Sequence, residues 1–196
     1  MKNIILASKS PRRKELLERL NISFDIKISR VDEDSFKQDS PWEFVEKLAY
    51  EKANSVSKLV DEDSLVIGCD TVVVFENEIL GKPKNIGQAA DYLKKLSGNK
   101  HLVYSGIAIL DVGSNKKYIS HEVTEVYMKD LNEEEIAYYI NTGEPLDKAG
   151  AYGIQGVGAI FIEKINGDYY NVMGLPLNKL YKGLNKLGVN YFEIVK

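Results

Sequence analysis

Two adjacent arginines, Arg12 and Arg13, stand where a serine-rich loop leads into an expected helix. The free N–H groups and the dipole of a helix N-terminus attract anions, and guanidinium groups bind phosphate oxygens in bidentate fashion. Cations are normally disfavoured at that end of a helix, so a surface helix with solvated arginines explains the pattern less well. The segment lacks the glycines of a Walker A loop. It indicates a phosphate site of another kind.

Asp70 is a carboxylate within an apolar run, between Leu65-Val66-Ile67 and Val72-Val73-Val74. Burying a carboxylate is costly unless it is paired or bound to a metal. Gly68, just before it, would let another backbone or a ligand approach closely. The alternative is an outward-facing aspartate at a strand end. The apolar residues on both sides argue against that alternative.

Two lysines and an acidic loop extend the set of candidates. Lys52 falls on the apolar stripe of an expected helix, where an ammonium needs an anionic partner unless it snorkels to solvent. Lys82 lies in a Gly-Lys-Pro turn, and Glu33 lies in the acidic loop 32–34; each alone is more often merely solvated. Magnesium prefers one or two protein carboxylates plus substrate phosphates, and Glu33 with Asp70 could supply that pair. Only the combination indicates Mg²⁺–polyphosphate chemistry.

Composition excludes several classes of function. The formal net charge of −3 lacks the basic excess of a protein that holds nucleic acid by its backbone. The single cysteine, Cys69, cannot form an internal disulfide and suits a reducing compartment. The apolar run 4–7 is too short for a signal peptide, and no stretch has the length of a membrane-spanning helix. We expect a cytoplasmic enzyme or binding domain.

Strand and helix patterns interleave along the chain, with hairpins among them, which predicts an α/β architecture around a mixed sheet. Helices are expected over residues 11–20, from a capping box at Ser40 onward, over 86–96, from a second capping box at Asn132 to Gly143, and over 176–187. Strands are expected over residues 4–7, 65–75, 101–111, 117–128, 159–163, 168–172 and 191–194. The Asn166-Gly167 pair predicts a type I′ hairpin between the strands at 159–163 and 168–172.

Several segments, in order along the whole chain, resemble the Maf proteins, a family of nucleoside triphosphate pyrophosphatases also called septum-formation inhibitors. The matching segments are Leu6–Arg13 with Glu15–Leu17, Val31–Glu33, Glu51–Ala53, Gly68–Thr71, Gly81–Pro83, Asp147–Gly156 and Gly167–Pro176. The resemblance implies one domain over residues 1–196, with an elongated mixed β-sheet, flanking helices and two lobes around a central cleft. It also implies a fold related to the inosine triphosphate pyrophosphatases, and a homodimer.

The resemblance assigns roles to individual residues. It implies that Asp70 is the proton acceptor for water attacking the α-phosphorus, and that Glu33 and Asp70 hold a divalent cation, Mg²⁺ or Mn²⁺. The residues that it places along the triphosphate are Ser8, Arg12, Arg13, Lys52 and Lys82.

Three positions resemble the branch of the family that acts on dTTP and UTP: Arg12, Thr71 and Gln155. An amide both donates and accepts hydrogen bonds, as does the imide edge of uracil or thymine, whereas a carboxylate only accepts. The expected reaction is hydrolysis to the nucleoside monophosphate and diphosphate. Preference among dTTP, UTP, CTP and modified pyrimidine nucleotides is left open. A non-catalytic, nucleotide-binding regulator of septum formation is the alternative, and nucleic-acid binding is disfavoured by charge.

Overall fold

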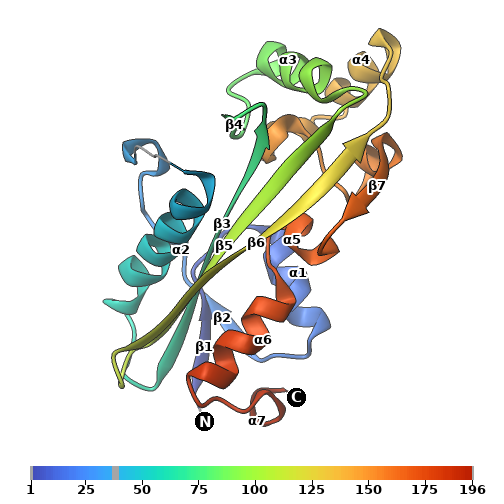
Figure 1. Cartoon of the computed structure of the whole chain (residues 1–196). Coiled ribbons are helices and arrows are strands. Elements are labelled where there is room, and N and C mark those ends of the chain that lie inside the picture. The colour runs from blue at the N-terminus through green and yellow to red at the C-terminus, as the bar shows by residue number, and fades with distance from the viewer. Residues whose placement is uncertain (1, 37–39, 196) are drawn as a thin grey trace. The chain divides into compact units, whose positions relative to one another are not determined.

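A computed structural model describes residues 2–36 and 40–195 of the 196-residue chain. It is an α/β protein with a seven-stranded mixed sheet in the order β2-β1-β3-β5-β6-β7, in which β4 pairs with β3 (Figure 1). β1 is parallel to β2 and β3, whereas β4 and β7 run antiparallel to their partners. The strands are β1 (Asn3–Leu6), β2 (Phe24–Ile26), β3 (Ser64–Phe75), β4 (Glu78–Leu80), β5 (Lys100–Asp111), β6 (Lys116–Met128) and β7 (Ile162–Asn166). The predicted α/β class with a mixed sheet is confirmed.

Helices connect most of the strands. The α-helices are α1 (Pro11–Arg19), α2 (Pro41–Ser57), α3 (Ile86–Leu96), α4 (Glu133–Asn141), α5 (Tyr169–Met173), α6 (Leu177–Lys186) and α7 (Tyr191–Ile194). Four short 3-10 helices are η1 (Glu33–Ser35), η2 (Glu144–Asp147), η3 (Ala149–Ala151) and η4 (Val157–Phe161). Within the described residues, none of these helices combines the length and apolar character that spanning a bilayer requires.

The chain divides into two compact units. Unit 1 consists of Met1–Asp70, Ser105–Glu122 and Gly174–Lys196, and unit 2 consists of Thr71–Tyr104 and Val123–Met173. β3, β5 and β6 therefore contribute residues to both units, and the boundary in β3 falls directly after Asp70.

In unit 1, α2 packs closely against the sheet because glycines face it. A Cβ atom added at Gly68 of β3 would lie 2.1 Å from the carbonyl oxygen of Ala49, and one added at Gly106 of β5 would lie 2.1 Å from that of Val45. These two carbonyls are one helical turn apart, so the pair of glycines lets the helix backbone rest directly on the strands.

Small residues continue this contact. Ala49, Ala53 and Val56 of α2 form one apolar cluster with alternate residues of β5, Ala108 and Leu110. The intervening Ile109 contacts the position of Gly183 in α6, where an added Cβ would lie 2.6 Å from its Cδ1 atom. Because successive side chains of a strand point to opposite faces, α2 and α6 cover opposite faces of the sheet in unit 1.

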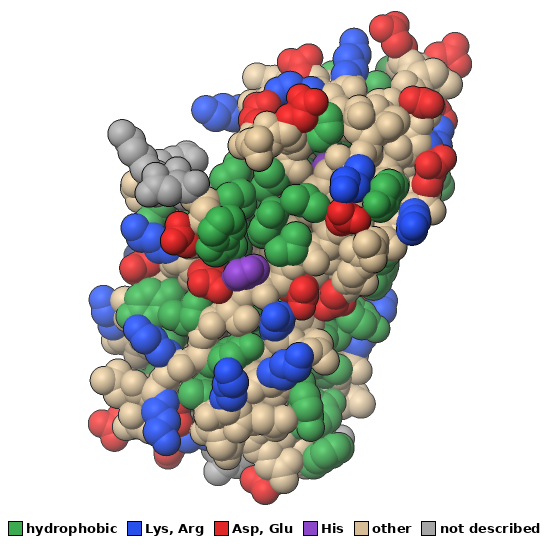
Figure 2. Space-filling view, viewed as in Figure 1, with side chains coloured by type: hydrophobic (Ala, Val, Ile, Leu, Met, Phe, Trp, Pro, Cys, Tyr) green, Lys and Arg blue, Asp and Glu red, His purple; other side chains and the backbone are tan. Residues whose placement is uncertain are grey.

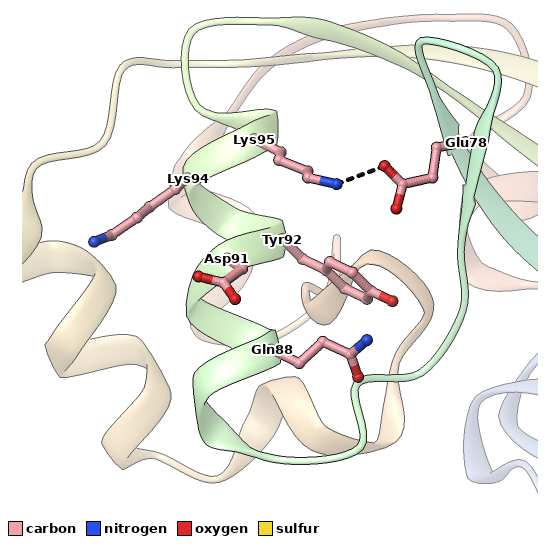
Figure 3. Close-up of a pocket in the computed structure, with 6 residues that line it drawn as sticks. All are labelled: Glu78, Gln88, Asp91, Tyr92, Lys94 and Lys95. Carbon is pink, nitrogen blue, oxygen red and sulfur yellow. Dashed lines mark hydrogen bonds and ion pairs between the residues drawn. The ribbon is translucent and has the colours of Figure 1, made fainter.

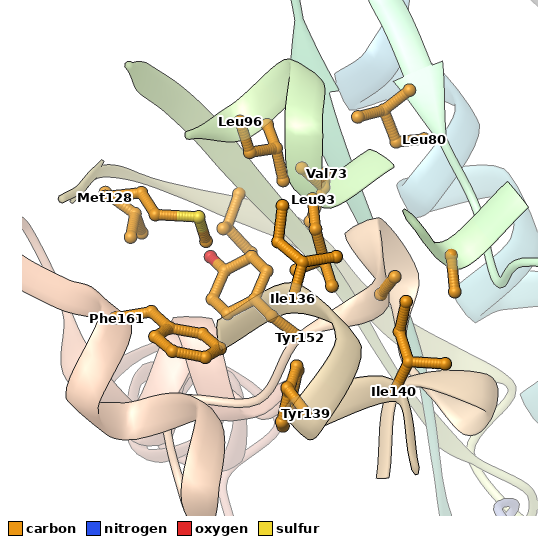
Figure 4. Packing of buried hydrophobic residues seen from close by; sticks show 14 residues of the cluster. Val73, Leu80, Leu93, Leu96, Met128, Ile136, Tyr139, Ile140, Tyr152 and Phe161 are labelled. Carbon is orange, nitrogen blue, oxygen red and sulfur yellow. The ribbon is translucent and has the colours of Figure 1, made fainter. Parts of the chain in front are cut away.

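Unit 2 has a core of its own in which α3 and α4 pack with the ends of the long strands (Figure 4). Tyr139 and Phe161 meet edge to face with ring centroids 5.1 Å apart. His101 is buried and its Nε2 atom lies 2.6 Å from the Tyr152 hydroxyl oxygen. Burial lowers the pKa of His101 to about 4, so this imidazole is neutral near pH 7 and is part of the buried core of unit 2.

The strands predicted at 168–172 and 191–194 are wrong, and so is the type I′ hairpin predicted at Asn166-Gly167. Residues 169–173 form α5, because the Asp168 carboxylate accepts a hydrogen bond from the Tyr170 N–H and starts a helix. The strand predicted at 159–163 is displaced, because residues 157–161 form η4 and it is β7 that pairs with β6. Residues 191–194 form α7, because the Asn190 side chain accepts from the Phe192 N–H in the same way. β2 is a short strand that the sequence patterns did not predict.

The two predicted capping boxes differ in outcome. At α4 the box is present: the Asn132 side chain accepts from the Glu135 N–H, and the Glu135 side chain accepts from the Asn132 N–H. At α2 the box is wrong, because the Ser40 hydroxyl donates to the Glu43 carboxylate at 2.6 Å and makes no capping bond to the backbone.

Replacing Gly68 with alanine should destabilise the protein by about 3 kcal/mol, since the new methyl group would have to push α2 away from the sheet. The matched control is Gly81→Ala, where a Cβ meets nothing within 4 Å; we expect a change within about 0.5 kcal/mol there. Urea unfolding measures both free energies. Equal stability of the two variants would contradict the close approach of α2.

Candidate functional site

A buried lysine–aspartate pair lies at the centre of the candidate site in unit 1. Lys52 of α2 donates from Nζ to the Asp70 Oδ1 atom of β3 at 2.6 Å, and the same Nζ lies 2.7 Å from Glu33 Oε1 of η1. Lys52 is 8% exposed and Asp70 is 5% exposed. Lys52 therefore faces the protein interior and has the anionic partners that its place on an apolar stripe requires.

The packing of α2 places this pair. Lys52 lies next to Ala53, and the Ala53 N–H is close enough to Gly68 that a Cβ there would approach it to 2.8 Å. Gly68 and Asp70 are two positions apart in β3, so both point to the face that α2 covers. The glycine that admits the helix thus brings the ammonium to the carboxylate.

Burial is the largest influence on the Asp70 carboxyl, and it raises the pKa of that group above its usual range. The charge and hydrogen bond of Lys52 lower this pKa, as does the charge of Arg13, whereas the nearby Glu33 carboxylate raises it. Asp70 is consequently a carboxylate that accepts a proton more readily than an exposed aspartate. Burial also raises the pKa of the neighbouring Cys69 to about 11, which keeps this thiol protonated.

Arg13 is held by two partners at the start of α1. Its Nε donates to the Gly174 carbonyl oxygen at 2.8 Å, and its Nη1 donates to the Ser8 hydroxyl oxygen at 3.2 Å. Ser8 also accepts from the Ser10 N–H at 3.1 Å, while Ser10 itself makes no side-chain capping bond. The loop before α1 thus orders a guanidinium at the helix N-terminus, where cations are normally disfavoured.

The sequence-predicted residues divide between the units. Unit 1 holds Ser8, Arg12, Arg13, Glu33, Lys52 and Asp70, and unit 2 holds Thr71, Lys82 and Gln155. Hydrogen bonds and ion pairs join Ser8 to Arg13, and Lys52 to both carboxylates. In unit 2, Lys82 is exposed in the turn after β4, and Gln155 is half-buried in the loop before η4.

The acidic pair suits a divalent cation, although the described residues contain no ready group of three His, Cys, Asp or Glu side chains for a metal. Glu33 and Asp70 each direct an oxygen at the same Lys52 ammonium. Mg²⁺ in proteins often takes one or two carboxylates as ligands while phosphates and water supply the remaining oxygens. Two carboxylates that converge on one point are suited to this role. The donor set therefore fits a metal that binds together with a polyphosphate.

A surface pocket in unit 2 has a different lining (Figure 3). It is formed by Glu78, Gln88, Asp91, Tyr92, Lys94 and Lys95. Lys95 pairs with Glu78 across it, and the predicted site residues do not contribute to it.

Sequence reasoning missed the backbone contribution of Gly174. This residue has φ +103°, a conformation that side chains other than glycine rarely adopt, and its carbonyl holds Arg13 from 161 positions away. The available signal was the glycine itself, between Met173 and Leu175, although it does not say which side chain the carbonyl meets. Gly106 was missed in a similar way, because the sequence shows a glycine there but not that the backbone of α2 lies against it.

Comparison with known protein families places the chain in one of them. A family profile described as "Maf-like protein" matches residues 3–187. The chain belongs to the Maf family.

Relatives of high identity carry one name. A "dTTP/UTP pyrophosphatase" of Alkaliphilus metalliredigens is 56% identical over 95% of this chain and 96% of its own length. Proteins of the same name from Clostridium botulinum and Clostridium novyi are 57% and 52% identical, over 97% and 95% of this chain and 100% and 98% of their own lengths. A dITP/XTP pyrophosphatase structure from Mycobacterium abscessus aligns over 96% of this chain and 98% of its own, at 12% identity and a TM-score of 0.43.

The Asp70 carboxyl should titrate above the usual value of about 4 for aspartate. Lys52→Met should raise this pKa further because it removes a positive charge, and Glu33→Gln should lower it because it removes a negative one. Carboxyl ¹³C shifts recorded against pH, with Asp70→Asn to assign the signal, measure all three. Shifts of the same sign in the two variants would contradict the arrangement of charges around Asp70.

Proposed function

We propose that this protein is a nucleoside triphosphate pyrophosphatase that hydrolyses dTTP and UTP to two products, the nucleoside monophosphate and free diphosphate (pyrophosphate). The observation that carries the proposal is the buried Asp70 carboxylate, bound to Lys52 beside Glu33, in a chain of the Maf family. The relatives named dTTP/UTP pyrophosphatase, at 52–57% identity over nearly the whole chain, support the substrate class.

Asp70 acts as the general base in this proposal. Its carboxylate takes a proton from water, whose oxygen then attacks the α-phosphorus, and the bond from that phosphorus to the bridging oxygen breaks so that pyrophosphate leaves. A base works best when its pKa lies near the working pH, and burial moves that of Asp70 in this direction. The hydrogen bond from Lys52 keeps the carboxylate oriented before the proton is taken.

The cations bind the triphosphate. Arg13 is ordered by Ser8 and Gly174 before any ligand arrives, so less conformational entropy is lost on binding. We assign Arg12, Lys52 and Lys82 to the same task. A divalent cation held by Glu33 and Asp70 would neutralise charge on the phosphate oxygens. In such reactions positioning and electrostatic stabilisation supply most of the catalysis.

Base selection is assigned to Arg12, Thr71 and Gln155. The Gln155 amide can donate to and accept from the imide edge of a pyrimidine base. The formal net charge of −3 lacks the basic excess that suits a nucleic-acid backbone, and Figure 2 shows acidic as well as basic side chains on the face that it displays. We extend the proposal to a cytoplasmic homodimer; light scattering on purified protein distinguishes the dimer from a monomer.

Purified protein with Mg²⁺ should release pyrophosphate from dTTP and UTP faster than from ATP or GTP, and an excess of EDTA should abolish the release. A coupled pyrophosphate assay over the nucleotide panel measures this. Binding of dTTP without turnover would instead indicate a non-catalytic, nucleotide-binding regulator. Full activity in EDTA would remove the divalent cation from the proposal.

Asp70→Asn should lower kcat by at least about 100-fold, as expected for loss of a general base. The matched control is Asp91→Asn, which changes an exposed aspartate of α3 and should leave kcat unchanged. Circular dichroism confirms that both variants are folded. A rate near that of the unmodified protein in Asp70→Asn would show that another group takes the proton.

A further inference from the structure

The loop that carries Gln155 is anchored before and after that residue. On one side, the Gly153 N–H donates to the Tyr139 hydroxyl oxygen at 3.1 Å. On the other side, the Glu144 carboxylate accepts from the Val157 N–H at 3.0 Å. These contacts lie within unit 2 and hold the backbone two residues away from Gln155 in each direction.

The two anchors are linked to each other. The Tyr139 hydroxyl donates to Glu144 Oε1 at 2.9 Å, and the same oxygen accepts from the Gly158 N–H at 3.4 Å. Tyr139 and Glu144 thus form one polar network to which both sides of the loop are bound. In such a network each member orients the next, so loss of one hydrogen bond weakens the others.

The base of this network is rigid. Tyr139 is fully buried in the core of unit 2, where its ring packs edge to face on Phe161 (Figure 4). Burial, followed by the hydrogen bond to Glu144, raises the pKa of Tyr139, so its hydroxyl keeps its proton and remains a donor. The Lys148 ammonium donates to the Glu144 carbonyl oxygen at 2.7 Å and fixes the backbone from which the carboxylate extends.

The residue after Gln155 is shaped to this network. Gly156 has φ +78°, and a Cβ added there would lie 2.8 Å from Glu144 Oε2. Only glycine allows both this conformation and this approach of the backbone to the carboxylate. The backbone at Gln155 is therefore held between a hydrogen bond at Gly153 and the carboxylate contacts from Gly156 onward.

We propose that Glu144, bound to Tyr139, is a positioning residue that sets base selectivity by holding the loop of Gln155. This inference rests on the proposed function, because it gives Gln155 a base to recognise. An amide that discriminates between base edges must be held within a fraction of an ångström, since a displacement of about 1 Å can cost about 100-fold in rate. Glu144 does so without contacting the substrate.

Glu144→Gln tests the proposal, because it keeps the size of the side chain and replaces one acceptor oxygen by an NH₂ group that competes with the backbone donors. The matched control is Glu134→Gln, which removes the same charge from an exposed position of α4. Steady-state kinetics with UTP and GTP give the ratio of the two kcat/KM values. We expect this selectivity for UTP to fall about tenfold in Glu144→Gln, mainly through a higher KM for UTP, and to stay unchanged in Glu134→Gln.

A double variant separates positioning from general stability. If Glu144 acts through Gln155, the ratio in Glu144→Gln/Gln155→Ala should equal that in Gln155→Ala alone, because coupled residues are not additive. An unchanged ratio in Glu144→Gln, or an equal loss for both nucleotides, would overturn the proposal. Additive losses of selectivity would do the same.

Amide hydrogen exchange measures the anchoring independently of activity. Val157 and Gly158 should lose protection in Glu144→Gln, and Gly153 should lose it in Tyr139→Phe, while Glu134→Gln leaves all three protected. Unchanged protection in both variants would overturn the anchoring itself. A wild-type chain that hydrolyses no nucleoside triphosphate yet shows these exchange effects would refute the proposed function and the selectivity role, but not the anchored loop.

Discussion

Burying a carboxylate in the middle of a β-strand is costly unless a cation is buried with it. In unit 1, Lys52 is the cation that accompanies Asp70. The attraction between buried charges roughly offsets their desolvation, so the Lys52–Asp70 pair adds little net stability by itself. Removing Lys52, however, would leave the buried Asp70 charge without this partner, at a cost of about 3–5 kcal/mol, whereas removing Asp70 would leave Lys52 paired with Glu33. The pair is therefore better understood as a chemical requirement that the fold accommodates.

The accommodation depends on how closely a helix can approach a sheet. Gly68 and Gly106 remove the two side chains that would keep α2 at the usual distance, and the alanines of α2 keep its own surface low. The Lys52 side chain consequently reaches Asp70 inside the protein, where the carboxylate balances its positive charge in place of water. The same packing shields most of the carboxylate from bulk solvent, which raises its pKa and makes it a better proton acceptor.

The sequence predicted those features that depend on local pattern or on the cost of burying charge. α3 has the bounds that its pattern indicated, and the Asn132 box starts α4 as expected, because both signals lie within a few neighbouring residues. The burial of Lys52 and Asp70 followed from charges on apolar stripes. α5 could not be predicted in this way, since its aromatic residues favour a strand and its place is fixed by Asn171, which donates to Val103 and Thr124 far along the chain. The contact of Gly174 with Arg13 is likewise long-range, and the family motifs indicate the remaining candidate residues without their geometry.

The single cysteine, Cys69, can report on the packing around Asp70. Cys69 lies beside Asp70 in the same strand, has no exposed surface, and its thiol stays protonated. A disulfide reagent can reach that sulfur only when the surrounding structure opens locally. The labelling rate of the native protein therefore measures how often this opening occurs. Cys69 thus reports local opening of the packing around Asp70, and under the proposed function a bound nucleotide should lower its labelling rate.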